Sequence, residues 1–168
     1  YGTTLTHFTI LWDRMGGENL QTWHNERLER GLQIVDGNAQ VKELVSAGKC
    51  DMGYTDTDDF YLAVDEGKPV AAVPVRLETG STICIPNTVS IIRGTENPEA
   101  AQKLVDYLLS ADCELRLANS RSRQVPLGDV DQTKLPEEVK MLKGWAADGA
   151  PLHDLLPARS EVINWLKA

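Results

Sequence analysis

Apolar residues recur at helical spacing in eight stretches of the chain. In the first of them, Phe8, Leu11, Trp12 and Met15 fall on one face, because residues three and four positions apart share a face of an α-helix. The same spacing, bounded by glycine, proline or a capping residue, recurs along the sequence. It predicts helices over residues 7–15, 20–28, 38–47, 60–66, 98–109, 113–118, 136–147 and 158–166.

Short continuous apolar runs lie between these helices. Each is bounded by turn-forming residues or prolines, which is typical of buried strands. The runs predict strands over residues 32–35, 50–55, 69–75 and 83–92. Because strands and helices alternate, the sequence predicts an α/β fold with a mainly parallel sheet.

Composition and charge narrow the class of protein. The chain has 168 residues, 42% of them hydrophobic and 25% charged, which suits one ordinary domain or two small lobes. The formal net charge of -8 argues against a nucleic-acid partner, because binding to phosphates needs a clustered excess of Lys and Arg. Cys50, Cys84 and Cys113 form no CxxC pair, so a structural zinc site is not expected.

The densest polar feature is the run of residues 56–59, Asp-Thr-Asp-Asp, between a predicted strand and a predicted helix. The run therefore lies at the carboxyl end of a predicted strand, and in open α/β sheets ligands bind at that edge. The carboxylates of Asp56, Asp58 and Asp59 repel one another unless they are exposed or neutralised by a cation or a donor. Two alternatives stay open here: Asp58 or Asp59 caps the next helix, or the D-x-D spacing marks a metal-dependent phosphate-transfer enzyme.

A second polar feature is the hydroxyl-rich start of the chain. Thr3, Thr4 and Thr6 stand beside His7 at the start of a predicted helix, where hydroxyls and free N–H groups form a site for an anion or a carbonyl. Capping of the helix by Thr4 or Thr6 explains the same residues. Asn38, after a glycine at another helix start, is a comparable case.

Several motifs occur in an order that points to a family. They are Gly-Thr-Thr with Thr-His in residues 2–7, Val-Asp-Gly-Asn in 35–38, Gly-Tyr-Thr-Asp-Thr-Asp-Asp in 53–59, Ile-Pro-Asn-Thr-Val-Ser-Ile-Ile-Arg-Gly in 85–94, and Gln-Val-Pro-Leu in 124–127. The set resembles the later part of the extracytoplasmic solute-binding proteins of ABC importers, in the ferric-iron-type family.

The resemblance implies a type II periplasmic-binding-protein fold that is incomplete, with the first lobe largely missing. It implies a second-lobe α/β domain over 1–78, a crossover strand and helix over 79–127, and a C-terminal helical segment over 128–168. The apolar strand 83–92 would then lack its neighbours, which predicts a homodimer through this region.

The implied function is solute binding in the periplasm, without catalysis, in partnership with a membrane permease. The expected ligand-binding residues are Thr3, Thr4, Thr6, His7, Asn38, Asp56, Asp58 and Asp59. Asp58 and Asp59 match the positions of the tyrosines that ligate the metal in the iron binders, so they are the expected ligands of iron or another hard cation, although carboxylates also suit an amine. A ligand-sensing regulatory domain on the same fold is the alternative.

Overall fold

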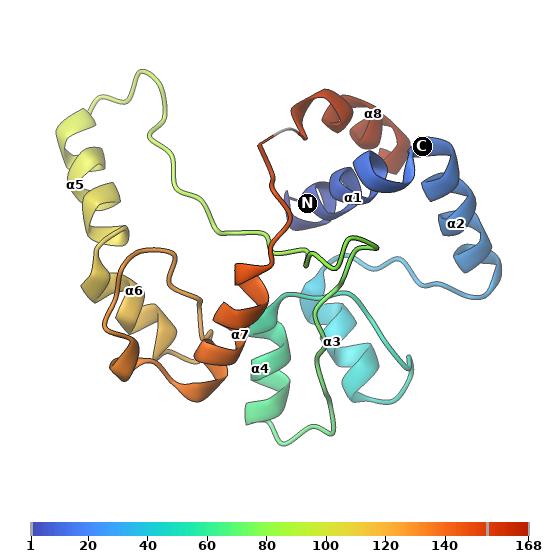
Figure 1. Ribbon diagram of the computed structural model, residues 1–168, viewed down its shortest axis with the longest axis horizontal. Helices are drawn as coiled ribbons and strands as arrows, with labels where there is room; N and C mark the ends of the chain where they lie inside the picture. The colour runs from blue at the N-terminus through green and yellow to red at the C-terminus, as the bar shows by residue number, and fades with distance from the viewer. Residues whose placement is uncertain (1, 154, 168) are drawn as a thin grey trace. The chain divides into compact units, whose positions relative to one another are not determined.

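The computed structural model describes residues 2–153 and 155–167, and the regular structure in them is helical (Figure 1). The α-helices are α1 (Gly2–Met15), α2 (Gly17–Glu29), α3 (Asn38–Ser46), α4 (Thr57–Asp65), α5 (Pro98–Leu108), α6 (Ala111–Ala118), α7 (Glu137–Ala147) and α8 (Leu156–Lys167). A short 3-10 helix, η1, spans Gln132–Lys134.

The helices predicted from apolar spacing are confirmed, with ends that shift by a few residues. Local signals explain their boundaries. Pro98 stands in the first turn of α5, where its missing N–H costs nothing. Ser110 caps α6 by accepting a hydrogen bond from the Cys113 backbone N–H at 3.2 Å, which separates α6 from α5.

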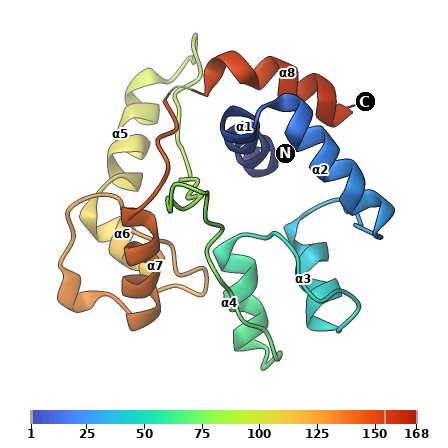
Figure 2. The same ribbon diagram turned by 45° about the vertical axis from the view of Figure 1, so that its right-hand side comes forward.

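The predicted α/β fold of the type II periplasmic-binding class is wrong. The described residues contain no β-strand longer than an isolated bridge, and the segments 32–35, 50–55, 69–75 and 83–92 run as extended or irregular backbone (Figures 1 and 2). An apolar run sets the local conformation, but a strand also needs a neighbour that accepts and donates its backbone hydrogen bonds. Ile34, Val73 and Ile92 in these runs are 74%, 84% and 80% exposed.

Two isolated bridges are the nearest approach to a sheet in the described residues. Arg76 and Thr82 form an antiparallel bridge, and Thr82 and Gly149 form a parallel one. The Thr82 N–H donates to the Asp148 carbonyl at 2.9 Å, and the Ala150 N–H donates to the Thr82 carbonyl at 2.9 Å. Thr82 is fully buried at this junction.

The chain forms two compact units, and each is assembled from separate stretches. Unit 1 comprises residues 1–34, 74–86 and 148–168, and unit 2 comprises residues 35–73 and 87–147. The domain division expected from the sequence, after residues 78 and 127, stays a prediction.

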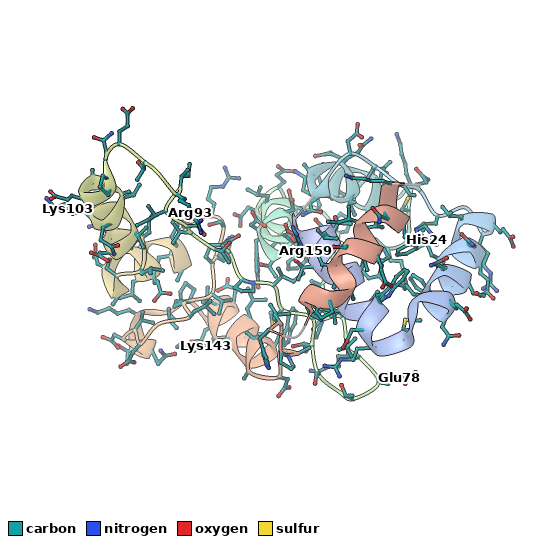
Figure 3. All side chains as sticks on the ribbon, turned by 90° about the horizontal axis from the view of Figure 1, so that it is seen from above. His24, Glu78, Arg93, Lys103, Lys143 and Arg159 are labelled. Carbon is teal, nitrogen blue, oxygen red and sulfur yellow. The ribbon has the colours of Figure 1, made fainter. Side chains whose placement is uncertain are left out.

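Unit 1 is built on α1, which packs against both α2 and α8. Ile10 of α1, Leu20 of α2 and Val162 of α8 are the large side chains that this packing buries completely. Figure 3 labels His24 on α2, whose ring meets Trp165 of α8 edge to face at 5.3 Å between centroids.

Unit 2 contains two packed regions. In one, α3 packs on α4. In the other, a hydrophobic cluster joins α6, the segment after it and α7, through Ala118, Val130, Leu135 and Val139. Helix α5 contacts α6, and Lys103 projects from α5 away from the ribbon (Figure 3).

Candidate functional site

The residues predicted to bind solute divide between the two units. Those in unit 1 are Thr3, Thr4, Thr6 and His7, and those in unit 2 are Asn38, Asp56, Asp58 and Asp59.

In unit 1, the threonines lie inside α1 rather than at its N-cap, because the helix already begins at Gly2. The prediction that Thr4 or Thr6 caps the helix is therefore wrong. The Thr6 hydroxyl donates to the Gly2 carbonyl at 3.0 Å, while Thr3 and Thr4 are exposed. Burial lowers the pKa of His7, whose ring meets Phe8 edge to face at 5.6 Å. Thr3 and Thr4 are thus the hydroxyls of this group that solvent reaches most freely.

In unit 2, the starts of α3 and α4 lie side by side. The Asn38 side-chain amide, in the first turn of α3, donates a hydrogen bond to the carboxylate of Asp56. The Thr55 hydroxyl donates to the Asn38 carbonyl at 3.3 Å. These two contacts fix the segment that precedes α4 against the first turn of α3.

Gly53 allows this close approach. A Cβ at this position would overlap the Cγ1 atom of Val41 and would meet Val45 at 3.3 Å. Both valines belong to α3, so the backbone at residue 53 passes directly over the apolar face of that helix. A larger side chain would push the segment, and Asp56 with it, away from Asn38.

The acidic turn, which we define as Asp56, Asp58 and Asp59, opens α4. Asp56 is the N-cap residue, but its carboxylate bonds to Asn38 and makes no capping bond. Asp58 and Asp59 lie within the first helical turn. The alternative in which one of them is the cap is therefore wrong, and the turn keeps carboxylate oxygens for other partners.

The charges of the acidic turn are poorly compensated. Burial raises the pKa of Asp56, repulsion from Asp58 raises it further, and the Asn38 hydrogen bond opposes both effects. Burial also raises the pKa of Asp59, with repulsion from Asp58 in the same direction and the nearby Lys42 ammonium opposing them. The charged form of each of these two carboxylates thus carries an electrostatic cost, which a bound cation would offset.

The positive charge of Lys42 lowers the pKa of Asp59, but the Lys42 ammonium already has other partners. Its Nζ atom lies 3.1 Å from Glu43 and 3.8 Å from Glu66, and its side chain is only 11% exposed. The hydrogen bond to Glu43 raises the pKa of Lys42. Because Lys42 is shared among acidic groups, it offsets only part of the charge of the acidic turn.

A bare metal ion is not fully coordinated by these residues. In the part of the chain that the structure describes, no three His, Cys, Asp or Glu side chains converge as a metal site. Asp58 and Asp59 can supply two carboxylates, and a hard cation needs about six oxygen ligands. Other groups, such as those of a chelating solute, would have to complete the shell.

Sequence reasoning missed Lys42 and the role of Gly53. Gly53 opens the motif in residues 53–59, but the reason that a side chain does not fit there is Val41, which lies twelve positions earlier. The helical spacing of Val41 and Val45 did carry a signal for Lys42, because a lysine beside an apolar stripe lies at the edge of the packed face, where its stem can be buried.

Comparison with known protein families assigns the chain to one of them. The sequence model described as "Bacterial extracellular solute-binding protein" matches residues 2–112, well over half of the 168 residues. The chain belongs to this family. The matched range includes both groups of predicted binding residues. Neither the curated proteins nor the solved structures gave a match.

Membership defines the function at a coarse level. This solute-binding protein has a substrate-binding role in transport, its ligand is a small solute, and its family acts outside the cytoplasm. Within the described residues, no helix has the length and apolar character that a membrane crossing needs.

Proposed function

We propose that this solute-binding protein serves an ABC-type importer, and that the acidic turn of unit 2 binds a cationic part of its solute. The proposal rests on the ordered motifs that resemble the ferric-iron-type binders of such importers and on the family match. The acidic turn supports it from chemistry, because three carboxylates stand at one helix start with Asn38 orienting one of them.

The observation that carries the proposal is that the negative charge of this turn is only partly compensated. Carboxylates normally face the N-terminus of a helix favourably, since the helix dipole stabilises them there. Here burial and mutual repulsion overcome that effect and raise the pKa of Asp56 and of Asp59. A cation bound at the turn would screen the repulsion and offset the cost of burying the charges, so the groups that raise each other's pKa also favour its binding.

The acidic turn supplies too few oxygen ligands to coordinate a bare metal ion, and this narrows the class of solute. Two or three carboxylates suit an ammonium group, or a metal ion whose other ligands come from a chelator, better than a bare ion. We therefore propose a metal chelate, with ferric iron among the metals, or a zwitterion that carries an amine. An uncharged sugar would gain nothing from the carboxylates.

The proposed partners are a membrane permease and, through the apolar segment 83–92, a second copy of the chain. Val89, Ile91 and Ile92 in this segment are 38%, 39% and 80% exposed, and apolar side chains in such a row favour association. Periplasmic location belongs to the same proposal.

Isothermal titration calorimetry of the protein with ferric citrate, calcium and a small amine zwitterion tests the solute class. We expect binding of at least one probe and a loss of about tenfold in affinity for Asp58→Asn and for Asp59→Asn, since each removes a charged partner of the cation. Glu99→Gln is the matched control, because Glu99 is an exposed carboxylate in the first turn of another helix of unit 2. Unchanged affinity in both aspartate variants would refute the role of the turn.

A further inference from the structure

Unit 2 is assembled from two separate stretches of chain, and one side-chain pair ties them together. Asp65, the last residue of α4, belongs to the stretch 35–73, and Arg123 belongs to the stretch 87–147. The Arg123 guanidinium donates from Nη1 to Oδ2 of Asp65 at 3.1 Å and from Nη2 to Oδ1 at 2.8 Å. This two-point geometry fixes direction as well as distance.

The surroundings of Arg123 restrict it further. Its guanidinium lies over the ring of Tyr61 in α4, 4.7 Å from the ring centroid, and Nη1 also donates to the Arg121 carbonyl at 3.1 Å. The side chains of Arg123 and Asp65 are 19% and 26% exposed. The two side chains are thus partly shielded from water, and the two-point contact together with the ring of Tyr61 restricts the orientation of the guanidinium.

The backbone of Arg123 is also unusual. Its φ of 45° is positive, and among the described non-glycine residues Arg123 alone has a positive φ. A side chain with a Cβ adopts this conformation at a cost, so the surrounding contacts must hold it there. The Arg123 N–H donates to the Ser120 carbonyl at 3.1 Å, which closes the tight turn that aims the guanidinium at α4.

We propose that Arg123 is a positioning residue for solute binding, because it anchors the last turn of α4 and thereby fixes the acidic first turn of the same helix. The inference rests on the proposed function of that turn. Helix α4 has nine residues, so Asp59 and Asp65 are separated by roughly 9 Å along one rigid rod. The Asn38–Asp56 bond holds the first end of α4, and the Arg123–Asp65 pair holds the other.

The test compares Arg123→Ala and Arg123→Lys with Arg121→Ala. Arg121 carries the same charge two positions away, but its side chain is 72% exposed and its nearest approach to Asp65 is 3.9 Å, so it is the matched control. We expect a fivefold or greater loss of affinity for the calorimetric probe in both Arg123 variants, since lysine keeps the charge but cannot make the two-point contact. We expect less than a twofold change in Arg121→Ala.

A double-mutant cycle separates positioning from general destabilisation. If Arg123 acts through the acidic turn, Arg123→Ala loses most of its effect on affinity in an Asp59→Asn background. Equal losses in both backgrounds would overturn the proposal.

Hydrogen exchange at the Phe60 amide, which donates to the Asp56 carbonyl at 3.2 Å, gives a readout that needs no ligand. We expect faster exchange in both Arg123 variants than in Arg121→Ala. If the unmodified protein binds none of the probes, the proposed function fails and this exchange alone decides whether Arg123 positions α4. Unchanged exchange in the Arg123 variants refutes the anchoring.

Discussion

The packing of α1, α2 and α8 in unit 1 and the packing of α3 on α4 in unit 2 depend on different forces. In unit 1, aromatic rings meet across the helices: Trp165 contacts Phe8 and Trp12, both with 5.6 Å between centroids, and His24 at 5.3 Å. Such pairs add to the burial of apolar area. Ile10, Leu20 and Val162 complete a dry contact.

Polar contacts link α3 to both ends of α4. No residue of α3 in the described structure is fully buried. Instead, Asn38 bonds to Asp56, and Lys42 reaches Glu66 from the side of α3. Like-charged groups at one helix start cost stability, and regions that bind ligands commonly carry such a cost. The comparison therefore teaches that the helices of unit 1 are stabilised by a buried apolar contact, whereas the α3–α4 pair carries an electrostatic cost at its acidic turn.

The largest effect expected from this difference is in unit 1. Leu20→Ala removes a completely buried side chain of α2, and we expect a loss of about 3 kcal/mol in the free energy of unfolding. Leu28→Ala on the same helix is the control, because Leu28 is 40% exposed, and its loss should be about 0.5 kcal/mol. Urea unfolding followed by circular dichroism measures both. Similar losses for the two variants would mean that α2 is not held by a buried contact.

A medium effect is expected where the α3–α4 pair does depend on close packing. Gly53→Ala places a methyl group into Val41, and we expect a loss of about 1–3 kcal/mol in the free energy of unfolding, together with weaker solute binding. Gly37→Ala is the control, since a Cβ there meets nothing within 4 Å and its φ of 174° suits any residue. Denaturant unfolding and calorimetry of both variants check this. A harmless Gly53→Ala would contradict the close approach of the segment to α3.

The same contrast explains what the sequence could predict. Helical spacing is local, so α5 and α7 were predicted nearly to the residue. Strands depend on pairing with distant segments that no local pattern specifies, and in the described structure residues 50–55 and 83–92 do not pair into a sheet. In the candidate site, the predicted Asn38 and Asp56 do meet, whereas the anchor formed by Asp65 and Arg123 joins residues 58 positions apart and left no local signal.

The smallest expected effect tests the sign of the charge cost in the α3–α4 pair. Burial, followed by repulsion from Asp58, raises the pKa of Asp59 above its unfolded value, so the folded chain holds this proton more tightly than the unfolded chain does. Ionisation at neutral pH therefore costs stability, and the cost disappears as the pH falls through the folded pKa. Asp59→Asn should be more stable than the unmodified protein at pH 7, by about 0.5 kcal/mol or less because the site is partly solvated.

Asp65→Asn is the matched control with the opposite sign. The hydrogen bond from Arg123 lowers the pKa of Asp65, so its ionised form stabilises the fold above the unfolded pKa, and that stability is lost as the pH falls through the folded pKa. Urea unfolding at several values between pH 3 and pH 7 should thus show Asp59→Asn above the unmodified protein and Asp65→Asn below it at pH 7, with both differences shrinking in acid. If Asp59→Asn is instead the less stable protein at pH 7, the ionised Asp59 stabilises α4, and the acidic turn does not carry the electrostatic cost from which its affinity for a cation was inferred.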